Sequence, residues 1–359
     1  MKILSLPVDR GGCGYLRVRQ PFQMINRHTD SEAHVMDKDD DPVALVEALS
    51  LSDIVVVRQG GEVGRPSLEA LVLKHTGKPM KAKWVLDIDD NVELISPYSA
   101  HYHEYGLTEV THKGEKLWKD GEDDFILPRN RAKVMSLFRS MFEYDLVTVT
   151  TEKLAEYARQ FNKNVAILPN YVDLSQWWKL DTKPHAQLRV GWSGGHSHYE
   201  DWHTLKKPLN DLMRKYQFKL VLAGTGFTGL VDKDLEHLVE VHPWVDFPAH
   251  SYRMMALDLD IAVIPLADLP FNHYKSPIKL YEFSALGVPS VVANVTPYRE
   301  VTPSASYTTS DGFQDTLGIL LHDSIYRDTI GAQARGRAVN EWDANKHADD
   351  WVDAYASIL

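Results

Sequence analysis

"SPIKLYEFSALGVPSVVA", from Ser276 to Ala293, joins a helical pattern directly to a strand pattern. Ser276 is a favourable N-cap, and Pro277 is a favourable first helical residue. Gly287 stands where the helix is expected to end, and the β-branched run at 289–293 follows it. A helix that leads at once into a buried strand is the repeating unit of parallel sheets covered by helices.

The same alternation of short apolar runs and helical patterns extends along the whole chain. In the first half, strand patterns lie at 2–8, 53–59, 83–89, 145–150 and 165–170. In the second half, they lie at 188–194, 218–224, 244–248, 259–266 and 289–293. The alternation predicts the α/β class, with two Rossmann-like, doubly wound parallel-sheet domains.

The domain boundaries follow from a change in composition. A polar, proline-containing segment without a clear period, at 173–187, predicts a linker. The first domain then covers 1–172, with an inserted loop at about 96–130, and the second covers 188–338. The segment 339–359 has aromatic residues at near-helical spacing and is expected to form a closing helix on the first domain. A length of 359 residues suits two cores better than one.

The composition is that of a soluble globular protein, with 44% hydrophobic and 25% charged residues. No apolar run approaches the roughly 18–20 residues that cross a bilayer, and the amino terminus lacks a signal-peptide pattern. The single cysteine, Cys13, precludes an intrachain disulfide and fits a cytoplasmic location. A net charge of −11 does not favour general binding to nucleic-acid phosphates, although a local basic groove stays open.

The helix after 259–266 is the first candidate site. Ligands bind beyond the carboxyl ends of the strands in an open α/β sheet, where a helix amino terminus offers free N–H groups. Lys275 and Lys279 add charge suited to a diphosphate, and Glu282, one turn beyond Lys279, suits the hydroxyls of a ribose. The pattern leaves equally open an ordinary ion pair between Lys279 and Glu282 on a solvated surface.

A second candidate is the turn "GWSGG" at 191–195, where Gly194 and Gly195 would let the backbone approach a phosphate closely. A plain strand-to-helix turn is the alternative. His196 and His198 beyond it are spaced like metal ligands on a strand, but no third ligand is evident, so no metal is expected.

A third candidate is "GGCGYLRVRQP" at 11–21, in which Gly12 and Gly14 precede a helix that carries Arg17. Cys13 lacks the partners of a nucleophile and is expected to be a small buried thiol.

The fourth candidate is acidic. In "VLDIDDN" at 85–91, Asp87, Asp89 and Asp90 end a strand, where carboxylates are costly unless they face a cleft. They could bind sugar hydroxyls, cap the next segment or hold a divalent metal, and metal binding is the least supported of the three.

Taken together, these segments resemble the retaining glycosyltransferases of the GT-B fold called family 4 or "group 1". "SPIKLYEFSALGVPSVVANVTPYREV" resembles that family's donor-binding helix and following strand, and "RVGWSGG" its donor-domain loop. "GGCGYLRVRQP" resembles its glycine-rich first loop, and "FEYDLVTVTTEKLAEY" with "VAILPNYVD" its last amino-domain strands. The resemblance implies transfer of a sugar from a nucleotide-diphosphate sugar, with a UDP-sugar as the expected donor, with retention and without a metal or further cofactor.

The resemblance also implies roles for individual residues. The catalytic residues would be Lys279, Asp89 and Asp90, and Glu282 would bind the ribose. The donor diphosphate would contact Gly12, Gly14, Gly194, Gly195, His196, Lys275 and Lys279. Candidates on the acceptor side are Tyr15, Arg17, Tyr102 and His103.

The sequence departs from the family at three places. Tyr274 stands where the family often has a first Glu, eight residues before the ribose-binding one. His196, Ser197 and His198 stand where its phosphate loop often has Arg and Lys. Asp89 and Asp90 replace its amino-domain His-Asp pair. These departures concern the sugar contacts more than the nucleotide contacts.

Four functions stay open. A cell-surface glycan or its precursor is the expected acceptor. The first alternative is a modified base of viral DNA, for which Arg17, Arg19, Arg129, Arg131 and Lys133 could line a local groove. The second is a protein that binds a nucleotide or glycan on this scaffold without turnover, and a two-domain epimerase is a weaker enzyme alternative. The sequence predicts no oligomeric state.

Overall fold

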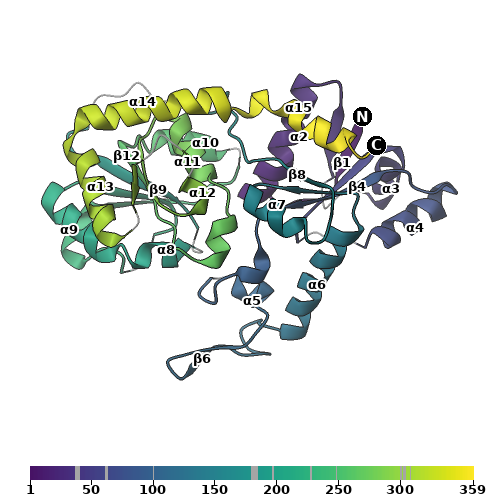
Figure 1. Cartoon of the computed structure of the whole chain (residues 1–359), viewed down its shortest axis with the longest axis horizontal. Helices are drawn as coiled ribbons and strands as arrows, with labels where there is room; N and C mark the ends of the chain where they lie inside the picture. The colour runs from purple at the N-terminus through teal and green to yellow at the C-terminus, as the bar shows by residue number, and fades with distance from the viewer. Residues whose placement is uncertain are drawn as a thin grey trace.

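The computed structural model describes residues 1–36, 41–60, 64–99, 101–178, 185–195, 198–226, 229–247, 249–299, 301, 305–307 and 309–359. It shows an elongated molecule in which two α/β domains lie side by side (Figure 1). Each domain has a six-stranded parallel sheet with helices packed on it. The predicted fold class, two Rossmann-like doubly wound domains, is confirmed.

The first sheet has the strand order β2-β1-β3-β4-β7-β8, and every pair is parallel. Its strands are β1 (Lys2–Ser5), β2 (Glu32–Val35), β3 (Ile54–Arg58), β4 (Lys83–Ile88), β7 (Leu146–Val149) and β8 (Val165–Ile167). The strand order reverses between β1 and β3, so a ligand is expected outside their carboxyl ends.

The helices of the first domain pack on both faces of this sheet. They are α1 (Gly12–Gly14), the π-helix η1 (Tyr15–Arg19), α2 (Gln20–His28), α3 (Pro42–Leu51), α4 (Arg65–Thr76), the 3₁₀-helix η2 (Val92–Leu94), α5 (Tyr102–Tyr105), α6 (Leu127–Glu143) and α7 (Glu152–Ala158). Thr151 caps α7 by accepting a hydrogen bond from the Leu154 N–H.

Successive residues of a strand point to opposite faces, so the sheet separates two cores. Ile54 and Val56 pack with η1, α2 and the carboxy-terminal helix, whereas Val55 and Val57 pack with α3, α4, α6 and α7. Because both faces are covered, the central strands are continuous apolar runs rather than alternating ones.

The second sheet has the strand order β11-β10-β9-β12-β13-β14 and is also parallel throughout. Its strands are β9 (Arg189–Gly194), β10 (Lys219–Gly224), β11 (Val239–Pro243), β12 (Ile261–Ile264), β13 (Ser290–Ala293) and β14 (Ala305–Tyr307). The predicted strand at 244–248 is wrong. The edge strand lies just before it, in the polar run "VEVHP", and Trp244 and Phe247 belong to the following loop and line a cleft.

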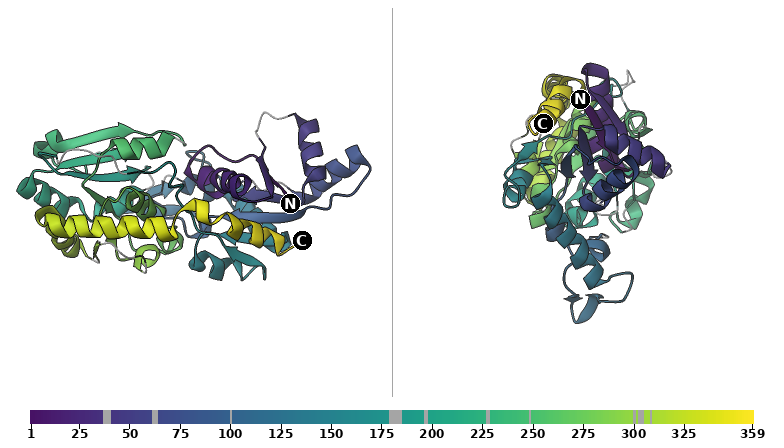
Figure 2. Two further views of the ribbon diagram at one scale, coloured as in Figure 1. Left: turned by 90° about the horizontal axis from the view of Figure 1, so that it is seen from above. Right: turned by 90° about the vertical axis from the view of Figure 1, so that its right-hand side faces the viewer.

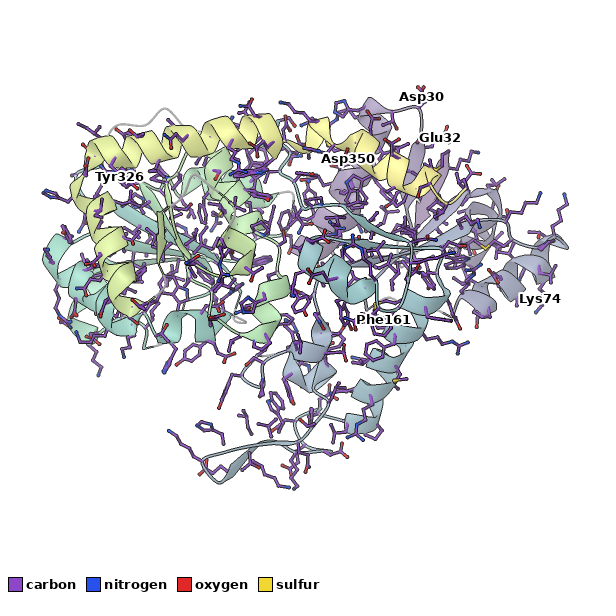
Figure 3. The ribbon with its side chains drawn as sticks, in the orientation of Figure 1. Asp30, Glu32, Lys74, Phe161, Tyr326 and Asp350 are labelled. Carbon is purple, nitrogen blue, oxygen red and sulfur yellow. The ribbon has the colours of Figure 1, made fainter. Side chains whose placement is uncertain are left out.

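Helices also cover the second sheet. They are α8 (Tyr199–His203), α9 (Lys206–Tyr216), η4 (Lys233–Leu238), α10 (Ala249–Ala256), η5 (Pro270–Tyr274), α11 (Ile278–Ala285), α12 (Thr296–Arg299), α13 (Ser310–His322) and α14 (Ser324–Glu341). Figure 3 shows side chains filling the space between the sheets and their helices, with Lys74 and Tyr326 at opposite ends of the molecule.

The chain returns to the first domain through α14, η6 (Ala344–Lys346) and α15 (Ala348–Ala356), which follow one another along the molecule (Figure 2). The expected closing helix at 339–359 is therefore interrupted. Asp343 caps η6 and redirects the chain, so Trp342 stacks on Tyr281 of the second domain at 4.2 Å. Trp351 and Tyr355 on α15 pack into the first core.

The inserted segment forms an ordered arm. Strands β5 (Val110–His112) and β6 (Glu115–Trp118) pair as an antiparallel hairpin that extends away from the body of the molecule (Figure 1). At its base, Tyr102, Trp118 and Phe125 form a small aromatic cluster with centroid distances of 5.6–5.8 Å. This cluster gives the arm a core of its own.

Candidate active site between the two domains

A cleft of about 670 Å³ lies between the domains, where residues following the strands of both sheets meet. The first domain contributes residues that end or follow β1, β3 and β4, among them Asp9, Arg58 and Asp89. The second contributes the end of β9, the loop after β12, and α11. The cleft thus forms where both parallel sheets present their carboxyl edges.

The helix α11 and the residues just before it place three predicted residues on this cleft. Lys275, Lys279 and Glu282 all line it. The helix begins at Ile278, with Pro277 as N-cap, so the predicted capping role of Ser276 is wrong. Gly287 follows the helix with φ +68°, a conformation that a residue with a Cβ rarely adopts, and ends the helix as predicted.

The partners of Lys279 and Glu282 decide between a ligand site and an ordinary surface ion pair. Lys279 Nζ lies 3.1 Å from His198 Nε2, and Glu282 Oε1 lies 3.2 Å from His250 Nε2. Neither Lys279 nor Lys275 is paired with a carboxylate among the described residues, and Lys275 lies over the Phe271 ring. The two lysines are therefore available to an anionic ligand.

Burial, together with the charge of Lys275, lowers the pKa of Lys279 to about 8. The ammonium is still charged near pH 7, although its charged form is destabilised. A ligand that brings negative charge to this point would relieve that destabilisation, so the lysine is suited to bind an anion.

Three carboxylates and one guanidinium form the opposite wall. Arg58 donates to both Asp89 oxygens at 2.8 and 3.0 Å, and to Asp9 at 2.9 Å. Burial would raise the pKa of Asp89, but its pKa is lowered because the Arg58 guanidinium stabilises the ionised carboxylate. Burial and the neighbouring Asp89 charge raise the pKa of Asp90 to about 7. Two adjacent carboxylates therefore differ in protonation near neutral pH.

Most predicted donor and catalytic residues line the cleft. They are Asp89, Asp90, Gly12, Gly194, Lys275, Lys279 and Glu282. A Cβ on Gly12 would lie 3.4 Å from the Phe247 ring of the second domain, so the glycine loop reaches across the cleft. Gly195 is not among the lining residues, and His196 lies outside the described residues. Cys13, expected to be buried, is exposed at the cleft wall.

Gly14 and Arg17 of the glycine loop, which were predicted to contact the donor and the acceptor, have structural roles instead. A Cβ on Gly14 would lie 2.1 Å from the Asp9 carbonyl oxygen, so Gly14 allows the tight turn rather than contact with a ligand. Arg17 is fully buried, where it donates to Asp87 at 2.6 and 3.0 Å and to Asn170 at 3.1 Å. Its assignment to the acceptor side is wrong, because its guanidinium neutralises a carboxylate inside the first domain.

The other acceptor-side candidates also lie outside the cleft lining. Tyr15 stacks on Phe247 at 4.7 Å and joins the two domains. Tyr102 is buried in the aromatic cluster of the arm, and His103 lies 3.6 Å from Glu104. The described residues of the inserted segment that do line the cleft are Ser96, Ser99, His101, Glu104 and Tyr105.

Four of the cations considered for a DNA groove have partners within the chain. Arg129 pairs with Asp124 at 2.8 Å, and Lys133 lies 3.5 Å from Glu104. Arg131 donates to the Leu107 carbonyl at 3.4 Å. Arg17 is buried away from these three residues, which lie together on α6.

Several cleft residues were missed by the sequence analysis. Asp9, Arg58, Asp201 and His250 were not considered, and His198 was considered as a metal ligand and as a departure in the phosphate loop, but not as a partner of Lys279. Arg58 ends β3 beside Asp87 of β4, so its position at a strand end was a usable signal. Among the described residues, no three His, Cys, Asp or Glu side chains are grouped as metal ligands would be. The described helices include none long and apolar enough to span a membrane.

Comparison with known proteins identifies this architecture. No protein-family model matches the sequence, and no curated protein is similar to it in sequence. Among solved structures, HepE of Anabaena in complex with UDP-glucose matches with a TM-score of 0.64 and 15% identity, over 99% of this chain and 100% of that chain. The catalytic domain of starch synthase IV from Arabidopsis thaliana, bound to ADP and acarbose, matches with a TM-score of 0.60 and 9% identity, over 99% of each chain. A glycosyltransferase from Rickettsia africae matches with a TM-score of 0.61 and 11% identity, over 100% of this chain and 98% of that chain. The chain therefore has the GT-B fold.

Proposed function

We propose that this protein is a glycosyltransferase that moves a sugar from a nucleotide-diphosphate sugar to an acceptor held mainly by the first domain. The observation that carries the proposal is the placement of Lys275, Lys279 and Glu282 on the interdomain cleft, with both lysines free of carboxylate partners among the described residues. The GT-B fold supports it, because solved structures of this fold hold UDP-glucose and ADP. A UDP-sugar is the expected donor.

The second-domain wall would act on the leaving group. When the glycosidic bond breaks, the diphosphate gains negative charge, so cations beside it bind the transition state better than the ground state. Lys279 on α11 and Lys275 just before it are placed to supply that charge, together with the free N–H groups at the start of α11.

Glu282 would bind the ribose of the donor. Its side chain is buried at 7% exposure and is held by His250, so it offers a carboxylate in a fixed direction. A carboxylate accepts hydrogen bonds from two neighbouring hydroxyls, and charge-assisted bonds of this kind are stronger than neutral ones.

The first-domain wall would contact the transferred sugar and the acceptor. Asp90, with a pKa of about 7, is suited to exchange a hydrogen bond or a proton with a sugar hydroxyl. Retention of configuration and independence of metal remain parts of the proposal that rest on the resemblance to family 4. No cofactor beyond the nucleotide sugar is proposed.

The acceptor side favours a neutral, hydroxyl-rich molecule such as a glycan. Its lining includes Asp9, Asp89, Asp90 and Glu104, and Arg58, the one arginine among the described lining residues, is already paired with two carboxylates. Such a wall repels a polyanion and offers hydrogen-bond acceptors to hydroxyls. This observation counts against the DNA acceptor.

The experiment is a thermal-shift panel of nucleoside diphosphates and UDP-sugars, followed by product analysis with glycan acceptors. A ligand that binds the folded state raises the melting temperature by mass action, so the panel fixes the base and the sugar. Slow hydrolysis of the matching nucleotide sugar without acceptor distinguishes an enzyme from a protein that only binds. A panel without any shift would refute the proposed function.

A further inference from the structure

Behind Lys279, a row of three polar side chains runs into the second domain. His198 is buried in the turn that follows β9, and its Nε2 lies 3.1 Å from Lys279 Nζ. Its Nδ1 lies 2.6 Å from Oδ2 of the buried Asp201. The other Asp201 oxygen accepts from the Ala267 N–H at 2.8 Å and from the Asn272 amide at 3.1 Å. The far end of the row is thus anchored to the loop that follows β12.

The partners of His198 fix where its proton lies. An ammonium can only donate and a carboxylate can only accept, so the ring must donate from Nδ1 to Asp201 and accept at Nε2 from Lys279. Burial, together with the charges of Lys279 and Lys275, lowers the pKa of His198 to about 3, which keeps the ring neutral. A neutral ring can hold the ammonium without adding a second positive charge beside it.

We propose that Asp201 and His198 are positioning residues that orient the Lys279 ammonium toward the donor diphosphate. This inference rests on the proposed function. A lysine side chain has several rotatable bonds, and ordering it on binding would cost conformational entropy. Asp201 and His198 reduce this entropic cost, because they order the lysine before the ligand binds. One of the three ammonium protons is bound to His198, and this contact directs the other two into the cleft.

The first test reads the histidine directly and needs no ligand. Long-range ¹H–¹⁵N spectra of histidine rings distinguish the two neutral tautomers and the charged ring, and a His198→Gln spectrum assigns the signal among the 16 histidines. The wild type should show a neutral, Nδ1-protonated ring at pH 6–8. A ring that is charged, or protonated at Nε2, would overturn the proposal.

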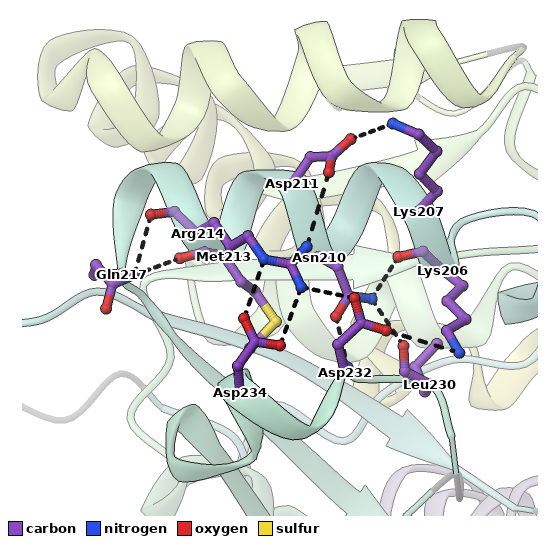
Figure 4. Close-up of polar contacts among 10 residues, drawn as sticks. All are labelled: Lys206, Lys207, Asn210, Asp211, Met213, Arg214, Gln217, Leu230, Asp232 and Asp234. Carbon is purple, nitrogen blue, oxygen red and sulfur yellow. Dashed lines mark hydrogen bonds and ion pairs between the residues drawn. The ribbon is translucent and has the colours of Figure 1, made fainter.

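The variant Asp201→Asn should reverse the tautomer while preserving shape. The amide oxygen can still accept from Ala267, but the amide nitrogen now donates to His198 Nδ1, so the ring proton moves to Nε2 and faces the ammonium. The matched control is Asp211→Asn. Asp211 lies on α9 and pairs with Lys207 at 2.6 Å (Figure 4). It is not among the residues that line the cleft. The control should leave the His198 signal unchanged, and a tautomer that stays the same in Asp201→Asn would overturn the proposal.

The second test is a double-mutant cycle on UDP affinity, measured by calorimetry. Asp201→Asn should weaken UDP binding about tenfold in the wild-type background, the size expected for a disturbed charge-assisted hydrogen bond. In a Lys279→Ala background it should cost almost nothing, because its effect passes through the lysine. His198→Gln should retain more affinity than His198→Phe, because only the amide oxygen can accept from the ammonium.

The outcomes separate the two proposals. Equal losses in both backgrounds would mean that the pair only supports the fold, and would overturn the positioning role. If the wild type binds none of UDP, ADP and GDP, the proposed function fails and the positioning role fails with it. If the wild type binds UDP but the cycle shows no coupling, only the positioning role fails.

Discussion

Each wall of the interdomain cleft carries a cation, and the two walls hold their cations differently. On the first-domain wall, Arg58 is bonded to Asp89 and Asp9, so its cation is already neutralised. On the second-domain wall, Lys279 contacts only the neutral His198 among its described partners, so its cation is held but not neutralised. An arginine paired with carboxylates organises a site, whereas a lysine held by a neutral group remains available to a ligand.

The largest effect is expected at the available cation. Lys279→Ala should lower kcat on the order of a hundredfold, by analogy with the loss of an oxyanion donor, because the charge acts on the leaving diphosphate. The melting temperature without ligand should change little, because the wild-type ammonium is destabilised by burial. Lys279→Arg should rescue incompletely, since a planar guanidinium does not replace a point charge. A near-normal kcat for Lys279→Ala would contradict the claim that Lys279, unlike Arg58, is available to the ligand.

The next effect concerns Glu282. Glu282→Gln should weaken binding of the matching nucleoside diphosphate about tenfold, because the amide keeps the shape but loses the charged acceptor for the ribose hydroxyls. Calorimetric titration measures the change. Unaltered affinity would remove the ribose role and leave Glu282 as a partner of His250.

The pH dependence of binding should follow Lys279. With a pKa of about 8, its ammonium is charged below that pH and neutral above it, so nucleotide affinity should fall as the pH rises past 8, by up to about tenfold per unit. The titration is best made in an Asp90→Asn background, because Asp90 also gains negative charge near pH 7. Lys279→Ala should abolish the dependence, and a dependence that persists in this variant would assign it to another group.

A stability effect is expected on the acidic wall. The folded pKa of Asp90, about 7, lies above the unfolded value of about 3.9, so its contribution to stability is complete at low pH and is lost as the pH rises through 7. Asp90→Asn avoids that loss. It should raise the melting temperature at pH 8 by on the order of a few degrees and change it little at pH 4. An equal change at both pH values would show that burial does not disfavour the charge.

The smallest effect is expected from chelation. If the lysines and the α11 amino terminus neutralise the diphosphate, EDTA should leave transfer activity intact. Activity that is lost with EDTA and restored by Mg²⁺ or Mn²⁺ would reassign the carboxylates of the first-domain wall as metal ligands.

Local signals in the sequence were sufficient for the fold class. Apolar runs of strand length alternate with helical patterns, and this alternation depends only on neighbouring residues. The same signals placed Lys279 and Glu282 on one helix at the ligand-binding edge. Errors arose where long-range contacts overrode the pattern, as at 244–248, where an aromatic run became a cleft-lining loop and the polar segment before it became the edge strand.

The sequence by itself determined the two parallel sheets, the helix end at Gly287 and the candidate residues at the strand ends. Only the tertiary structure decided which charges are neutralised. His198 and Lys279 are 81 positions apart, and Arg17 and Asp87 are 70 apart, so no local pattern links them. Arg17, Arg58 and Lys279 all lie near glycines or strand ends in the sequence, so their local sequence does not distinguish them. Whether each of these charges is neutralised depends on which strand ends meet in space. A buried charge is tolerated only where an opposite charge or a hydrogen-bond acceptor lies within bonding distance.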